Sequence, residues 1–267
     1  MNQSTLIESV LRRDRAVVLA ALAAVTGLAW LYTLSGAGMP QMQGMGDMAE
    51  HAGHAMMRPM AWTPGYAALM LVMWWVMMVA MMVPSAAPMV LLFAAINRKQ
   101  REAGSPYVPT GIFLGGYLAI WGLFSGIATA AQWGLEAAGL LSPTMTTSSA
   151  VLGGGILIAA GLYQLTPIKQ ACLRHCRSPI MFITQHWRTG WSGAWRMGIE
   201  HGAYCLGCCW FLMALLFFGG IMNVLWIAGI ALYVLFEKVV PAGHWLSYAA
   251  GAGLTVWGIV ILAGAMT

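Results

Sequence analysis

A segment near the amino-terminal end carries a methionine or a histidine at every third position. These eight residues are Met39, Met42, Met45, Met48, His51, His54, Met57 and Met60. Thioether and imidazole ligands suit copper, and soft sulfur favours Cu(I) over harder divalent ions. Because the residues between them are small or polar and build no apolar core, we interpret the segment as a copper-binding loop. A methionine-rich linker of low complexity is the alternative.

A second group of methionines is expected on one face of a helix. Met70, Met73, Met77 and Met81 are spaced by three, four and four residues, and positions at this spacing share a helical face. Stacked thioethers would offer several weak sites to a moving Cu(I) ion. Methionine also fills irregular helix interfaces, so packing without metal is the alternative for this methionine face.

Three cysteines and a histidine are grouped in a later apolar segment. His201, Cys205 and either Cys208 or Cys209 are three or four residues apart, so an imidazole and two thiols would share a helical face. A Cys-x-x-Cys pair allows two sulfurs to bind one ion. Polar groups at membrane depth are costly without partners, which indicates a metal or redox role. Small residues buried at a helix interface are the alternative.

A further cysteine pair lies between two apolar segments, where Cys172, His175 and Cys176 occur together. This stretch is expected at the same membrane depth as Cys205 and Cys208. We therefore predict that both pairs converge on one site, with His175 or His201 as an additional ligand, because such sites assemble readily from two pairs. Copper is the preferred metal, and zinc would also suit this Cys/His cluster.

The composition indicates a membrane protein. Hydrophobic residues make up 60% of the 267 residues and charged residues only 8%, whereas soluble domains carry about 25% charged residues. Seven apolar segments are candidates to cross the bilayer, whose hydrocarbon core is about 30 Å thick. They cover residues 17–35, 65–93, 109–133, 149–165, 203–218, 222–236 and 246–265. We predict an all-α, polytopic transmembrane helix bundle of about seven spans, in which the two short segments, the fifth and sixth, form a tight hairpin.

Basic residues predict the orientation of the bundle. With the N-terminus in the cytoplasm and seven crossings, twelve of the thirteen Lys and Arg residues lie inside and only Arg58 lies outside. This assigns the chain to a bacterial inner membrane with the Met/His-rich loop on the outer face. Anionic lipid then accounts for the net charge of +5, without nucleic acid as a partner.

The expected organisation has three parts. Residues 1–35 form a signal-anchor helix, because its apolar stretch exceeds that of a cleaved leader. Residues 36–64 form the outer Met/His segment, and residues 65–267 form a six-helix membrane domain with the Cys/His cluster at its inner side.

Two features are expected at the inner interface. Trp187, Trp191 and Trp195 recur every four residues and would form one aromatic stripe on an interfacial helix. Glu237 and Lys238 are adjacent at the end of the sixth span and are expected to form an interfacial ion pair.

Three motifs carry a family resemblance. They are residues 77–89 (MMVAMMVPSAAPM), 163–179 (YQLTPIKQACLRHCRSP) and 201–213 (HGAYCLGCCWFLM). Over roughly residues 65–265 the sequence resembles a family of uncharacterised bacterial integral membrane proteins described as predicted metal-binding proteins. The resemblance implies an all-helical membrane fold and metal binding by the Cys and His positions, but no reaction. The Met/His segment lies outside it.

The leading hypothesis is a copper-binding membrane protein for uptake, transfer or delivery, with a membrane cuproenzyme or a copper chaperone as protein partner. No phosphate-binding Gly-x-x-x-x-Gly-Lys-Ser/Thr motif is present, so no ATP-driven step is expected. A metal-dependent or dithiol redox enzyme is the first alternative, although a non-enzymatic role is favoured. An assembly subunit with a structural zinc site is the second alternative.

Overall fold

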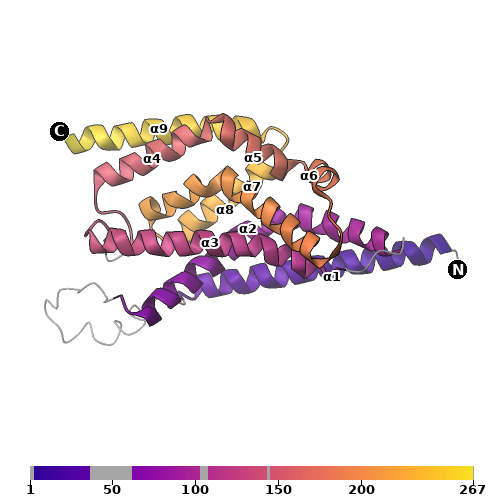
Figure 1. The fold of residues 1–267 in the computed structure, drawn as a ribbon. Coiled ribbons are helices and arrows are strands. Elements are labelled where there is room, and N and C mark those ends of the chain that lie inside the picture. Colours follow the sequence, from indigo (N-terminus) through magenta and orange to yellow (C-terminus); the bar gives the residue numbers. More distant parts are fainter. Residues whose placement is uncertain (1–2, 37–61, 103–107, 143–144, 267) are drawn as a thin grey trace.

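The computed structural model describes residues 3–36, 62–102, 108–142 and 145–266, and it is helical throughout these ranges apart from turns and one isolated bridge (Figure 1). The helices are α1 (Gln3–Leu34), α2 (Pro64–Glu102), α3 (Thr110–Ala137), α4 (Ala150–Gln164), α5 (Pro167–Arg177), α6 (Pro179–His186), α7 (Gly190–Gly219), α8 (Val224–Val239) and α9 (Gly243–Met266). The prediction of an all-α fold is confirmed. Met45, Met48, His51 and His54 lie outside the described residues.

Several helices are long and apolar enough to cross a membrane. Five qualify, in α1, α2, α3, α7 and α9, and a sixth span results if α4 and α5, bent by 64° relative to each other, are taken together. Each predicted apolar segment falls on a helix, but α8 has only 16 residues. The chain is therefore a multi-pass membrane protein, whereas the count of seven spans, the orientation and the three-part organisation stay predictions.

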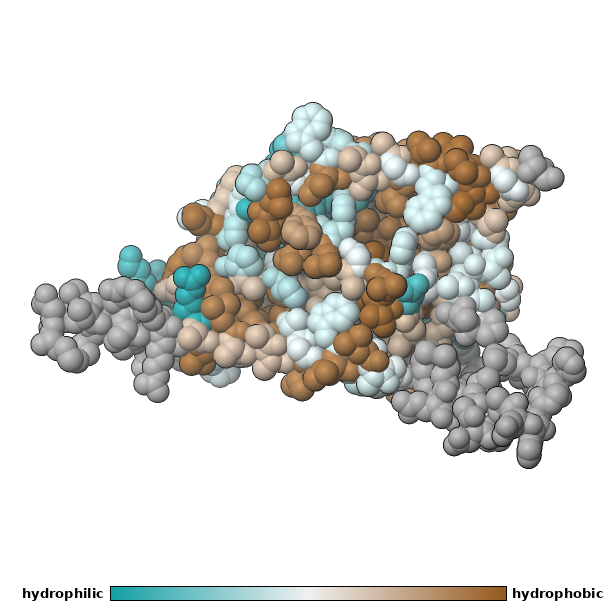
Figure 2. All heavy atoms as spheres, turned by 180° about the vertical axis from the view of Figure 1, so that it is seen from behind, coloured by the Kyte–Doolittle hydropathy of each residue, from teal (hydrophilic) through white to brown (hydrophobic). Residues whose placement is uncertain are grey.

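The molecular surface agrees with a lipid environment. Large apolar side chains are exposed on most helices, among them Leu28, Val151 and Leu225, and Figure 2 shows apolar residues over much of one face. An apolar surface of this extent is unusual for a soluble monomer and marks an interaction with membrane or protein.

The helices pack in pairs. The α1/α2 pair and the α4/α9 pair lie on opposite sides of the molecule, with α3, α7 and α8 between them (Figure 1). Close approach of α3 and α7 depends on Gly198, because a Cβ atom there would clash with the carbonyl group of Phe113. Small residues at such crossings let helix backbones approach closely in membranes.

The methionine face of α2 is turned into the protein. Met70, Met73, Met77 and Met81 are all at most 2% exposed, and α2 continues as a helix through Pro84 and Pro88. These methionines share one apolar core with the cysteines of α7. The sulfur-rich stretch of α2 is therefore continuous with the region where the thiols lie.

The expected tryptophan stripe is wrong. α6 ends at His186, Trp187 has an extended backbone with ψ of 126°, and α7 begins at Gly190, where φ is +80°. This break places Trp187 on a different element from Trp191 and Trp195, so the four-residue spacing does not correspond to one helical face. Trp187 packs against Phe93, with ring centroids 5.8 Å apart, while Trp191 and Trp195 are exposed.

Candidate metal centre

Four thiols from two helices gather in the interior and form what we call the thiol cluster: Cys176, Cys205, Cys208 and Cys209. The three α7 cysteines are at most 1% exposed. Cys176, near the end of α5, packs against the apolar core that contains these three cysteines. Cys208 and Cys209 donate to the Cys205 carbonyl oxygen over 3.1 and 3.0 Å. The structure thus brings together one member of the first cysteine pair with all three cysteines of α7.

Cys172 lies at the edge of this cluster. Its sulfur packs against Gly207 so closely that a Cβ atom on that glycine would be 2.8 Å away. It contacts the α7 backbone next to Cys208, and it is partly exposed. Cys172 therefore helps dock α5 on α7.

Two other helices complete the wall of the thiol cluster. The Met82 sulfur of α2 is 4.0 Å from the Cys209 sulfur. The Tyr117 hydroxyl of α3 is 3.1 Å from the Cys205 sulfur and 3.2 Å from the Met82 carbonyl oxygen. Tyr117 therefore joins α2 and α7 at the level of the thiols.

A buried lysine points at the same sulfur. Lys238 is 7% exposed, and its ammonium nitrogen lies 3.0 Å from the Cys205 sulfur and 3.0 Å from the Ser85 hydroxyl oxygen. Among the described residues no carboxylate pairs with Lys238. A buried cation is costly without a counter-charge, and a Cys205 thiolate would supply one. The expected interfacial pair of Glu237 and Lys238 is wrong, because neighbours in a helix point in different directions.

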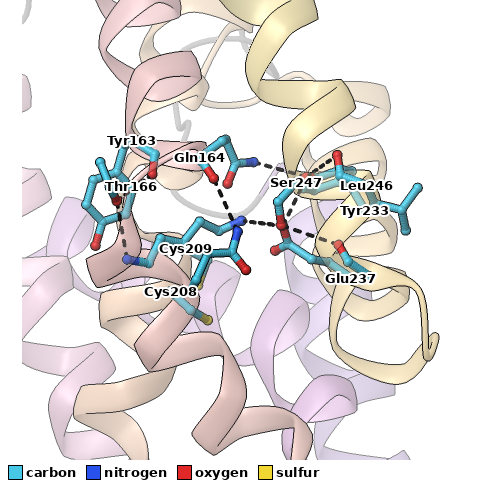
Figure 3. A network of polar contacts seen from close by, with 12 residues as sticks. Tyr163, Gln164, Thr166, Cys208, Cys209, Tyr233, Glu237, Leu246 and Ser247 are labelled. Carbon is cyan, nitrogen blue, oxygen red and sulfur yellow. Dashed lines mark hydrogen bonds and ion pairs between the residues drawn. The ribbon is translucent and has the colours of Figure 1, made fainter.

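Glu237 pairs instead with a lysine of α5. Its carboxylate forms an ion pair with Lys169, and both side chains are fully buried. Ser247 and Tyr233 donate to the same carboxylate oxygen over 2.5 and 3.1 Å, as Figure 3 shows. Lys169 precedes Cys176 by seven residues, so both occupy one face of α5. The ion pair therefore fixes α5 in the orientation that carries Cys176 to α7.

The two histidines near the cluster differ in their surroundings. His201 is 3% exposed, stacks on Tyr117 with centroids 5.6 Å apart, and its Nδ1 atom has no hydrogen-bond partner among the described residues. Since it precedes Cys205 by one helical turn, it remains a candidate ligand. The His175 ring stacks on Tyr204 at 4.1 Å, and its Nδ1 atom is 2.9 Å from the Ala171 carbonyl oxygen.

The donor set suits one class of metal. In the described part of the chain, no three His, Cys, Asp or Glu side chains are arranged as a ligand group for a metal ion. The Met82 thioether lies beside the Cys209 thiol, and His201 precedes Cys205 by one helical turn. Soft sulfur donors fit Cu(I), and the described residues show no ligand group arranged to hold a tetrahedral zinc ion.

Comparison with known proteins supports the same metal. A family model described as PpoB2, copper chaperone, matches residues 71–261. No match is found among curated proteins or among solved structures. The matched range contains all five cysteines and most of the methionine face, but not the Met/His segment. The family match supports copper as the bound metal and gives no support to zinc. With this match over most of its length and several membrane-crossing helices, the chain belongs to the PpoB2 copper chaperone family and is a copper-handling membrane protein.

Proposed function

We propose that the thiol cluster is the principal Cu(I) site of this protein. The observation that carries the proposal is the packing of Cys176 from α5 against the core that holds Cys205 and Cys208 of α7. Thiolate sulfur suits Cu(I) as well as zinc and iron–sulfur clusters, and the copper chaperone family match favours copper among them. Copper bound here would be shielded from water and from adventitious ligands, as a protein that hands on a labile ion requires.

Charge balance supports this assignment. A Cu(I) ion held by two thiolates carries one net negative charge, which is costly in a buried position. The Lys238 ammonium, 3.0 Å from the Cys205 sulfur, neutralises that charge. The complex would then be neutral as a whole. His201, whose Nδ1 atom has no hydrogen-bond partner in the described part of the chain, would provide an additional donor during loading or release.

The methionine face would connect this site with the Met/His segment. Met70 and Met82 are twelve residues apart on α2, a distance of about 18 Å along a helix. Buried thioethers of Met73, Met77 and Met81 fill this interval. Weak, repeated soft sites allow an ion to move on after it binds. We propose transfer from residues 36–64 on the outer side of a bacterial inner membrane toward the thiol cluster, with the N-terminus in the cytoplasm.

The partner that receives copper would be a membrane cuproenzyme or another copper chaperone. Cys172 and Cys176 are partly exposed on α5, whereas the α7 cysteines are buried. A sulfur ligand near the surface gives an acceptor a way to compete for the ion. Ligand exchange of this kind involves no nucleotide and no change of oxidation state.

A dithiol redox function is the second candidate. It is favoured by the packing of Cys176 against the core that holds Cys205 and Cys208, since neighbouring thiols can form a disulfide. The copper and redox functions predict opposite responses of the thiols. Copper binding keeps them reduced and protected, whereas redox turnover alternates them between thiol and disulfide.

Alkylation of the purified full chain tests the proposal. The protein is reduced in detergent micelles without oxygen, and a thiol-alkylating reagent is added with and without one equivalent of Cu(I). Mass spectrometry then follows each cysteine. We expect Cu(I) to slow alkylation of Cys176 more than that of Cys172, its neighbour on the same helix. If Cu(I) protects Cys172 and Cys176 equally from alkylation, or protects neither, the thiol cluster is not the Cu(I) site.

A further inference from the structure

A second group of soft donors lies at the opposite end of the methionine face. The amide nitrogen of Gln132 is 3.6 Å from the Met70 sulfur and 3.9 Å from the Met145 sulfur. Gln132 belongs to α3 and is fully buried, while Met145 comes from the loop that follows α3. Two thioethers from separate elements therefore converge on one side chain.

A carboxylate completes this group. Glu136 follows Gln132 by one turn of α3 and accepts its amide N–H over 2.9 Å. The other Glu136 oxygen accepts the indole N–H of Trp62 over 2.7 Å. The indole N–H of Trp74 donates to the Gln132 side-chain oxygen over 2.8 Å. These hydrogen bonds hold Gln132 and Glu136 in fixed positions, yet the carboxylate keeps lone pairs for a further contact.

Met145 has an unusual backbone conformation. Its φ of +57° lies in the left-handed region, and it is the only residue other than glycine with positive φ among the described residues. Its N–H donates to the Ser142 carbonyl over 2.8 Å, and its carbonyl accepts from Ile221 over 3.3 Å. Such a conformation persists only where the surroundings impose it, and it is found preferentially at functional sites. Here it accompanies the approach of a sulfur atom to Gln132.

The geometry points to a second Cu(I) site, formed by the Met70 and Met145 thioethers with the Glu136 carboxylate. We call it the thioether site. Two neutral sulfurs and one carboxylate around Cu(I) give a neutral complex, which lowers the cost of placing the ion in a partly buried position. Thioethers bind Cu(I) selectively but more weakly than thiolates. The site therefore binds and releases readily.

The position of the thioether site gives it a role in the proposed transfer, and the inference rests on that proposed function. Trp62, which anchors Glu136, follows Met60, the last residue of the methionine and histidine repeat, by two positions. Met70 is also the first member of the methionine face. The thioether site is thus the point at which copper would leave the Met/His segment and reach the buried thioethers of α2.

Methyl NMR of the full chain tests this inference. The protein is labelled with ¹³C at the methionine ε-methyl groups, placed in detergent micelles without oxygen, and titrated with Cu(I). Met70→Leu, Met145→Leu and Met89→Leu variants assign three resonances. Met89 is the matched control, because it is equally buried on α2 but belongs to a different apolar cluster. We expect the Met70 and Met145 methyl resonances to shift together while that of Met89 stays unchanged.

Two further variants separate this inference from the proposed function. Glu136→Gln is expected to abolish the joint shift at the copper concentration that saturates the parent. A Cys205→Ser/Cys208→Ser variant is expected to leave the joint shift intact, because the thioether site is separate from the thiol cluster. Unchanged Met70 and Met145 resonances in the parent, with Cys176 protected from alkylation, would overturn the thioether site alone. A joint shift without protection of Cys176 would overturn the thiol cluster alone.

Discussion

The ammonium nitrogen of Lys238 lies 3.0 Å from the sulfur of Cys205, although the two residues are 33 positions apart and come from different helices. This contact places a buried positive charge directly beside the thiol cluster. It connects α8 to α7 in the region where Cys176 of α5 and Met82 of α2 also pack. With Tyr117 of α3, five helices thus supply the surroundings of one group of sulfurs.

Replacing Lys238 by methionine is expected to weaken Cu(I) binding while the side-chain volume is nearly kept. A hydrogen bond to a charged group contributes about 1.5–3 kcal/mol, which corresponds to roughly a ten- to hundredfold loss of affinity. A competition titration with a coloured Cu(I) chelator measures the change. Lys238→Arg, which keeps the positive charge, should retain more affinity than Lys238→Met. Equal affinity of Lys238→Met and the parent would show that the ammonium plays no part.

The buried pair of Lys169 and Glu237 is expected to be essential for stability. Glu237→Gln leaves the Lys169 ammonium buried without its counter-charge, which costs about 3–5 kcal/mol. Thermal unfolding in micelles measures the loss. Glu200→Gln is the matched control, because Glu200 pairs with Arg188 and Arg196, whose side chains are 40% and 65% exposed. Exposed pairs contribute about 0–1 kcal/mol, so a similar effect of both variants would contradict this account of the fold.

Substitution within the methionine face separates copper transfer from packing. Met73→Leu and Met77→Leu nearly conserve volume, and such exchanges cost less than about 1.5 kcal/mol. Since leucine has no sulfur, the double variant should fold and yet accumulate less copper in cells than the parent. Cellular copper, measured by elemental analysis and normalised to protein level, gives the answer. If cells with the double variant accumulate as much copper as cells with the parent, the methionine face serves packing and takes no part in copper transfer.

The crossing of α3 and α7 is expected to tolerate no side chain at its closest point. Gly198→Ala would force the new methyl group onto the Phe113 carbonyl and should lower thermal stability by a few kcal/mol, as overpacking does. Gly155→Ala on α4 is the control, because nothing lies within 4 Å of its added Cβ atom. That variant should be neutral or slightly stabilising, through lower entropy of the unfolded chain. The reverse order of stabilities would be incompatible with the described packing.

The helical segments were predictable because length and apolar composition are local properties of a sequence. The spacing of Cys205 and Cys208 predicts that they share a helical face, and a shared membrane depth predicts their approach to Cys176. Helical periodicity does not determine which helices are lateral neighbours. For this reason the contacts of Cys205 with Lys238 and Tyr117 could not be foreseen.

Two expectations failed for related reasons. The tryptophan stripe assumed one continuous helix, but the chain breaks between His186 and Gly190. The pairing of Glu237 with Lys238 assumed that neighbours in sequence interact, whereas each side chain pairs across the bundle. The presence of a lysine and a glutamate in an otherwise apolar helix is a signal of buried partners that a sequence can provide. It does not reveal that those partners are Cys205 and Lys169.

Copper K-edge X-ray absorption of the Cu(I)-loaded protein tests the central claim most directly. The parent is compared with the Cys205→Ser/Cys208→Ser variant, each loaded with one equivalent of Cu(I) without oxygen. The account predicts thiolate sulfur as the main ligand in the parent and a loss of these thiolate contributions in the variant. Indistinguishable spectra, or a parent spectrum without thiolate sulfur, would contradict the assignment of the thiol cluster as the copper site.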